Sequence, residues 1–194
     1  MATILLNHTE INVGGHFPVV GEYAHSFLLV DSGMIDVPLS RFAGKPKVIA
    51  VIPSIDSAIG LIIARQLERL SVDWPDCAIL VISVDTPYAL SRAMEQERFR
   101  RVQLLCTLRG RDFHKDYGVM ITDIPLSGFM ATALIGVNAA DIVMYSELVS
   151  DLSFEPDYGT MAECLFPPIE EEAEEEIIDD AEQIAQLERY DPSI

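Results

Sequence analysis

Residues 48–70, VIAVIPSIDSAIGLIIARQLERL, contain a strand, a turn and a helix in direct succession. The β-branched run from Val48 to Ile52 is too short for a helix, and Pro53 ends the strand because proline has no N–H to donate. Asp56 or Ser57 is placed to cap the helix that follows. Its apolar and amide side chains recur every three or four residues and predict one buried stripe: Ile59, Ile62, Ile63, Gln66, Leu67 and Leu70.

A buried strand that leads into a helix N-terminus is a natural place for an anion or a thiolate. Unpaired backbone amides and the positive end of the helix dipole converge there. We therefore expect the turn at residues 53–57 to be the centre of any functional site.

The rest of the chain alternates strands and helices around this unit. The run Ala78–Val84 predicts a second buried strand, parallel to the first and joined to it by a right-handed crossover. Other predicted strands are Thr3–Leu6 with Glu10–Val13 as a hairpin, Ser26–Val30, Ile35–Leu39, Val102–Leu105, and a second hairpin of Thr132–Val137 with Ile142–Leu148. Predicted helices are Thr86–Glu97, opened by Pro87, Asp112–Tyr117, ended by Gly118, and Glu155–Leu165, with Pro156 in its first turn. This order is typical of a thioredoxin-type α/β sandwich.

The segment PSIDSAIG at residues 53–60 resembles the Pro-x-x-x-Thr-x-x-Cys signature of peroxiredoxins, specifically of the atypical two-cysteine thiol peroxidases of bacteria. FAGKPKVIAVIPSID, SVDTPYALSR, PLSGFMATALIGV and EPDYGTMAECL extend the resemblance over residues 1–166. It implies a thioredoxin-like peroxiredoxin sandwich, with a central mixed β-sheet flanked by helices and an N-terminal β-hairpin. The activity that it implies is thioredoxin-dependent peroxide reduction.

The same resemblance assigns site positions at which this sequence departs from the family. Pro53 stands at the signature proline, Ser57 at the threonine, Gly60 at the peroxide-attacking cysteine, Met94 at the resolving cysteine, and Thr132 at the arginine that supports the thiolate. We therefore expect no catalytic residue, and interpret the chain as a catalytically inactive pseudoenzyme that acts as a binding or regulatory module. Ser57 is better explained as a helix cap, and drift is a sufficient explanation for Gly60.

The alternative is an active antioxidant enzyme that uses a displaced thiol. Cys106 is the candidate, although its apolar surroundings, LLCTL, favour a buried thiol of raised pKa. Cys77 follows Asp76 and Cys164 follows Glu163, and an adjacent negative charge disfavours a thiolate. Arg109 and Arg111 are either lining residues of the peroxidase pocket or, more commonly for arginine, solvated surface residues.

Composition excludes several other classes of function. The chain has 194 residues, 49% hydrophobic and 23% charged, which suits one globular domain. Without a secretion signal or a spanning apolar run, we expect a cytoplasmic protein with no membrane contact. A net charge of −18 repels nucleic acid. The four histidines lack metal-ligand spacing and no nucleotide-binding motif occurs, so we expect neither metal nor cofactor.

The composition changes abruptly after residue 166. Residues 167–194, PPIEEEAEEEIIDDAEQIAQLERYDPSI, hold eleven acidic residues and one arginine, which is ten of the eighteen net negative charges. A solvated acidic tail is one interpretation. The other is an amphipathic helix on its own domain or on a protein partner, with a stripe at Ile169, Ala173, Ile177, Ala181, Ile184 and Glu188.

The resemblance also implies a homodimer. Family members pair through the face around the active-site loop, where PSID, DTPYALSR and PLSGF fall. Ile55, Tyr88 and Phe129 would form an exposed apolar patch there if the chain were a monomer.

Overall fold

The computed structural model describes residues 2–110 and 112–167, so the predictions for the acidic tail lie outside the described residues, apart from Pro167. The strands are β1 (Ala2–Leu6), β2 (Thr9–Gly14), β3 (Leu28–Asp31), β4 (Asp36–Pro38), β5 (Lys47–Val51), β6 (Ala78–Ser83), β7 (Val102–Cys106), β8 (Met120–Ile121), β9 (Ala133–Val137) and β10 (Val143–Leu148). The helices are α1 (Ala58–Leu70), α2 (Pro87–Glu97), α3 (Phe113–Asp116) and α4 (Tyr158–Leu165), with a 3-10 turn η1 (Leu39–Phe42).

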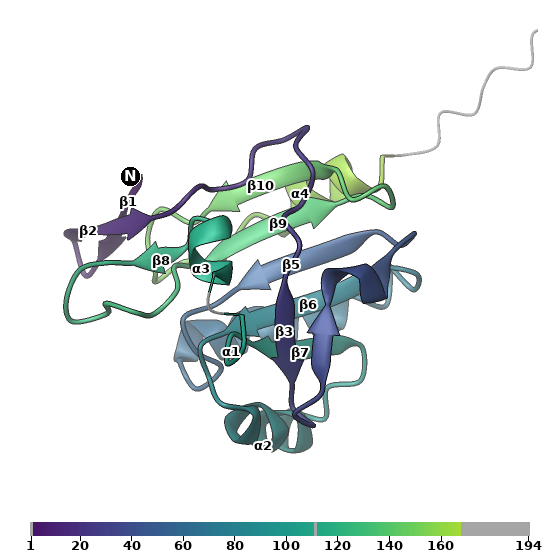
Figure 1. The fold of residues 1–194 in the computed structure, drawn as a ribbon, viewed down its shortest axis with the longest axis horizontal. Helices are drawn as coiled ribbons and strands as arrows, with labels where there is room; N and C mark the ends of the chain where they lie inside the picture. The colour runs from purple at the N-terminus through teal and green to yellow at the C-terminus, as the bar shows by residue number, and fades with distance from the viewer. Residues whose placement is uncertain (1, 111, 168–194) are drawn as a thin grey trace, which may run out of the picture.

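A seven-stranded mixed sheet in the order β10-β9-β5-β6-β7-β3-β4 forms the centre of the molecule (Figure 1). Strands β5, β6 and β7 are parallel, while β9 and β3 run antiparallel to their neighbours β5 and β7. All residues of β5, β6 and β9 are buried, because the sheet is covered on both faces. The predicted thioredoxin-like sandwich is confirmed.

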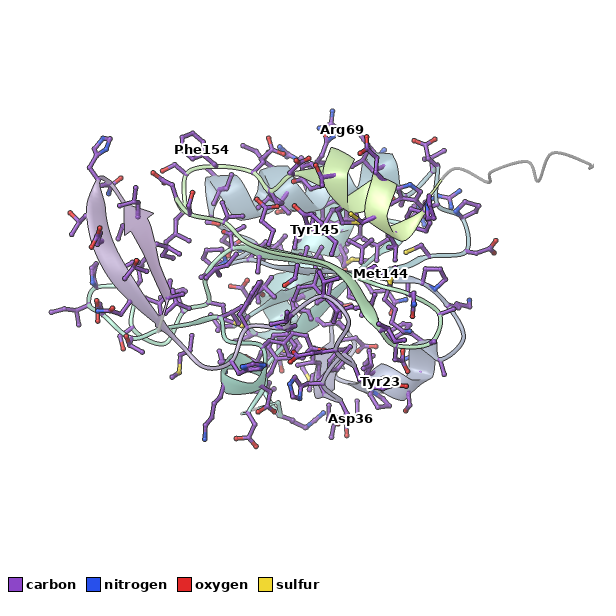
Figure 2. The ribbon with its side chains drawn as sticks, turned by 90° about the horizontal axis from the view of Figure 1, so that it is seen from above. Tyr23, Asp36, Arg69, Met144, Tyr145 and Phe154 are labelled. Atoms are coloured by element: carbon purple, nitrogen blue, oxygen red, sulfur yellow. The ribbon has the colours of Figure 1, made fainter. Side chains whose placement is uncertain are left out.

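Two hydrophobic cores lie on opposite faces of this sheet. The first packs α1, α2 and α4 against alternate strand residues such as Val48, Ala50 and Leu134. The second packs α3 and η1 against the intervening residues, such as Ile49 and Ile135. Figure 2 shows the division: Arg69, at the end of α1, lies on one side of the sheet, and Tyr23 and Asp36 lie on the other.

The predicted N-terminal hairpin is also confirmed. Strands β1 and β2 pair antiparallel, and β8 extends them into a small separate sheet. Asn7 and His8 form the two-residue turn with φ of 47° and 66°, the left-handed conformation that such hairpin turns require. Ile4, Ile11 and Ile121 contribute to a third, small core beneath this sheet.

Sequence periodicity was wrong about two details of the helices. Helix α4 begins at Tyr158 rather than at Glu155, because the Asp157 carboxylate accepts a hydrogen bond from the Thr160 amide at 3.0 Å and leaves Pro156 outside the helix. In α1 the buried stripe is Gly60, Ile63, Ala64 and Leu67, whereas Ile62 is 42% exposed.

One edge of the large sheet is short, and the other is covered at its start. Edge strand β4 has only three residues and ends in Pro38. At the opposite edge, the segment 18–24 lies against the start of β10: the Gly21 amide donates to the Val143 carbonyl, and the Val143 amide donates to the Glu22 carbonyl, both at 2.8 Å.

Within the part of the chain described by the structure, no helix is long and apolar enough to cross a membrane.

Candidate functional site

The candidate site is the turn between β5 and α1, at residues 53–57. Ser57 caps α1: its Oγ accepts a hydrogen bond from the Gly60 amide at 3.0 Å and donates one to the Ser54 carbonyl at 2.7 Å. The predicted capping role of Ser57 is therefore confirmed, and the same hydroxyl folds the turn back onto the helix. Pro53, the first residue of this turn, is buried.

Asp85 fixes the turn from the neighbouring strand. It follows the carboxyl end of β6, which lies beside the carboxyl end of β5. Its carboxylate accepts hydrogen bonds from the Ser54 hydroxyl at 2.9 Å and from the Ile55 amide at 2.7 Å. Arg92 on α2 pairs with Asp56 on the outer side of the turn. Asp85 is thus a positioning residue for the turn.

Asp85 is not among the site residues predicted from the sequence. Its position in the sequence, directly after the second buried strand, could have indicated a role at the turn. The carboxyl ends of adjacent parallel strands meet at one edge of a sheet. A carboxylate directly after the second buried strand is therefore close to whatever follows the first.

Gly60 lies where the turn leaves no space for a side chain. A Cβ at this position would lie 2.1 Å from the Ser54 carbonyl oxygen and 2.8 Å from the Ser57 Oγ. Atoms do not approach so closely, and the first of these belongs to the backbone, so that any side chain at residue 60 requires the turn to move. The interpretation of Gly60 as drift omits this constraint.

Thr132 immediately precedes β9 and lies beside the carboxyl end of β5, where the turn begins. The next residue, Ala133, pairs with Val51, the last residue of β5. The Thr132 side chain is 0% exposed, and its hydroxyl has no hydrogen-bond partner among residues 2–110 and 112–167. The Thr132 carbonyl accepts a hydrogen bond from the Val149 amide at 2.9 Å. A buried hydroxyl without a partner costs about 1–3 kcal/mol of stability and carries no charge for an anion.

Other candidate residues are not part of this turn. Met94 is half-buried on α2 and packs against the core on the helix side of the sheet. Arg109 pairs with Asp36 of the edge strand β4 and donates to the Met34 carbonyl at 3.3 Å, and it lines a cavity of about 340 Å³ with Ser26. Its guanidinium is therefore committed at the edge of the sheet, and Arg111 lies outside the described residues.

The three cysteines are free thiols in different surroundings. Cys106 is 0% exposed at the end of β7, and burial, followed by the charge of Asp85, raises the pKa of its thiol. Cys77 is half-buried, and burial raises its pKa to about 12. Cys164 lies half-buried on α4. A thiolate is the reactive form of cysteine, so burial disfavours reaction at Cys106 and Cys77.

The described residues contain no group of three or more His, Cys, Asp or Glu side chains arranged to hold a metal ion. The groups that the described residues gather at the turn are the Ser54 and Ser57 hydroxyls, backbone amides, the Asp85 carboxylate and the ion pair of Asp56 with Arg92.

The chain is similar in sequence and in fold to known proteins. No family model matches the chain. A thiol peroxidase of Vibrio cholerae is 29% identical over 156 residues, which cover 80% of this chain and 95% of that protein. The solved structure of a thiol peroxidase from Chromobacterium violaceum is 38% identical with a TM-score of 0.80, covering 84% of this chain and 94% of the other. A peroxiredoxin-like protein from Aquifex aeolicus shares the fold, with a TM-score of 0.79 at 23% identity over 84% of this chain and 95% of that one.

The identity to the Chromobacterium protein extends over nearly the whole of that chain, and the buried strands and the turn described above all fall within residues 1–166. The protein belongs to the thiol peroxidase family of peroxiredoxins.

Proposed function

We propose that this chain is a thiol peroxidase homologue without peroxidase chemistry, and that it serves as a binding or regulatory module. The observation that supports this most is the position of the Ser54 carbonyl, 2.1 Å from the place where residue 60 would carry a Cβ. The family resemblance puts the attacking cysteine at residue 60. The turn therefore leaves no space for a side chain at residue 60.

The remaining groups do not replace the thiol. Peroxide reduction needs a thiolate to attack the O–O bond and a cation to stabilise it. The Ser57 hydroxyl is engaged with the Ser54 carbonyl and the Gly60 amide, and its pKa without an adjacent base is far above neutrality. Thr132, at the position of the family's arginine, offers no charge.

A displaced thiol is the competing hypothesis. Cys106 is the candidate, but a fully buried thiol of raised pKa is a poor nucleophile. Its side chain belongs to the hydrophobic core on the helix side of the sheet, together with Val102 and Leu104. We therefore assign Cys106 a packing role.

The decisive experiment is a peroxidase assay on the full-length protein with a thioredoxin reducing system. We expect hydrogen peroxide and alkyl hydroperoxides to be consumed no faster than by the variant in which Cys77, Cys106 and Cys164 are all replaced by alanine. Turnover that depends on one of these thiols would overturn the proposal and identify the displaced nucleophile.

We further propose that the chain forms a homodimer through the face around the turn. Tyr88 at the start of α2 is 74% exposed, and Ile124 and Phe129, in the segment before β9, are 86% and 36% exposed. Helix α2 follows the carboxyl end of β6, and the segment with Phe129 leads to Ala133, which pairs with Val51 at the carboxyl end of β5. Ile55 does not contribute, contrary to the prediction of an exposed residue, because it is only 2% exposed beneath the turn. A monomer mass by light scattering at micromolar concentration would contradict the dimer.

The acidic segment 167–194 is the other interaction surface in this proposal. Its net charge of −10 suits a basic protein partner rather than nucleic acid or an anionic membrane. Three free cysteines suit a reducing compartment, and we propose a cytoplasmic location and no cofactor.

A further inference from the structure

The last described residues contact a groove on the side of the molecule away from the turn. Phe166 stacks on Trp74, with ring centroids 5.4 Å apart and an angle of 26° between the planes. Both rings line a groove of about 400 Å³, together with Pro46, Pro75 and Cys77. The groove therefore begins where the chain leaves α4.

A second cavity, of about 250 Å³, continues this groove and is cationic. The two share Pro75, Asp76 and Cys77, and the second is also lined by Arg41, Lys45 and Arg101. These three cations are exposed, and none of them forms an ion pair with another described residue. Asp73 and Asp76 are the acidic side chains of the groove and cavity.

The fold places these residues at one pole. Arg41 and Lys45 precede β5, residues 73–77 precede β6, and Arg101 precedes β7, and the starting ends of parallel strands meet at the same edge of a sheet. Figure 1 shows the end of α4 on the same side of the molecule as the starting end of β5. We call this surface, made of Arg41, Lys45, Arg101 and the Trp74 groove, the cationic pole.

The chain continues from this pole into its most acidic segment. Glu170, Glu171 and Glu172 follow Phe166 by only four to six residues, and an extended chain spans roughly 3.3–3.6 Å per residue. The acidic run is therefore tethered beside the three cations, at an effective concentration on the order of millimolar. Ile169, which precedes it, is apolar like the groove.

We propose that residues 168–194 bind in cis to the cationic pole, with the run Glu170–Glu176 against Arg41, Lys45 and Arg101. The occupant is the chain's own acidic segment, because its charge complements the pole and its starting point adjoins the groove. A basic protein partner of the acidic segment would compete with this contact. In this arrangement the acidic segment covers the cationic pole. The contact does not depend on whether the turn has lost its peroxidase chemistry.

Trp74 provides a probe for this contact because it is the only tryptophan in the chain. The experiment is acrylamide quenching of its fluorescence in the full-length protein at low salt. We expect the double variant Lys45→Glu, Arg101→Glu to raise the quenching constant about twofold. Salt of about 0.5 M should raise the quenching constant of the unaltered protein by the same factor, because exposed charges are screened beyond a few ångströms at such salt.

Two further variants make the result specific. Lys115→Glu alters an exposed cation on α3, in a different segment from the pole, and should leave quenching unchanged. Combining Lys45→Glu and Arg101→Glu with Glu170→Lys, Glu171→Lys and Glu172→Lys should restore protection of Trp74 by exchanging the charges. Equal quenching in all variants would overturn the proposal. Protection that disappears on dilution would show binding between two copies, and would equally exclude the contact in cis.

Discussion

In the first turn of α1, Ser57 contacts Gly60 so closely that no space remains for a side chain at residue 60. The Ser57 Oγ accepts the Gly60 N–H at 3.0 Å and lies 2.8 Å from the place where a Cβ of residue 60 would be, while the Ser54 carbonyl lies still closer to that place. The cap, the turn and the glycine therefore depend on one another.

The first prediction is that Gly60→Ala destabilises the protein by about 1–3 kcal/mol, because the methyl group displaces the backbone of the turn. Chemical denaturation measures this. Gly159→Ala is the matched control, since Gly159 also lies in the first turn of a helix and a Cβ there would make only an ordinary contact of 3.4 Å with Asp157. We expect that control to be neutral or to stabilise by about 0.4–1 kcal/mol. Equal effects of the two substitutions would show that the turn yields freely.

The second prediction concerns Asp85. Asp85→Ala leaves the Ser54 hydroxyl and the Ile55 amide without their acceptor, which should cost about 1.5–3 kcal/mol and speed hydrogen exchange at the Ile55 amide. Asp36→Ala, which removes an exposed ion pair with Arg109, should cost less than about 1 kcal/mol and leave exchange at Ile55 unchanged. If exchange at Ile55 is the same in both variants, Asp85 does not hold the turn.

Thr132 gives the third prediction. Thr132→Val keeps the shape of the side chain and removes the unpaired hydroxyl, so the free energy of unfolding should stay the same or rise by about 1 kcal/mol. Ser71→Ala is the comparison, because the Ser71 hydroxyl is buried and donates to the Glu68 carbonyl at 2.6 Å, and its loss should cost about 0.5–1.5 kcal/mol. A clear loss of stability in Thr132→Val would reveal a partner for its hydroxyl.

The fourth prediction is that Cys106 reacts with a small thiol reagent only at the rate of global unfolding, since its side chain is 0% exposed. Comparing the native thiol count of the unaltered protein with that of Cys106→Ala tests this. The two counts should agree under native conditions and differ by one thiol in denaturant. A lower native count in Cys106→Ala would show that Cys106 is accessible.

The fifth prediction is a loss of stability at alkaline pH through Cys77. Burial raises the pKa of this thiol from 9.0 to about 12, so the unfolded chain ionises first. Stability from the neutral thiol is fully present below pH 9 and falls as the pH rises toward 12, by about 1.4 kcal/mol at pH 10. Cys77→Ala should flatten the decline measured between pH 8.5 and 10, and an equal decline in this variant would contradict the prediction.

Local sequence patterns predicted most of the fold because each depended on neighbours along the chain. The β-branched run before Pro53, the cap at Ser57 and the hairpin of β9 and β10 are of this kind. The closed turn is only partly local: Ser57 holds the Ser54 carbonyl from within the turn, whereas Asp85, which follows β6, binds the Ser54 hydroxyl and the Ile55 amide. Likewise, burial of Ile55 and exposure of Ile62 depend on packing between elements, which periodicity does not contain.

The short edge strand β4 and the segment against β10 have a consequence for behaviour at high concentration. A sheet whose outer strands offer free N–H and carbonyl groups recruits strands from other molecules, which leads to aggregation. Pro38 ends one edge after three residues, and the exchange of hydrogen bonds between Val143 and the segment 18–24 occupies the start of the other. Strand addition is therefore disfavoured along β4 and at the start of β10, which leaves the outer edge over residues 144–148 as the place where another strand would pair.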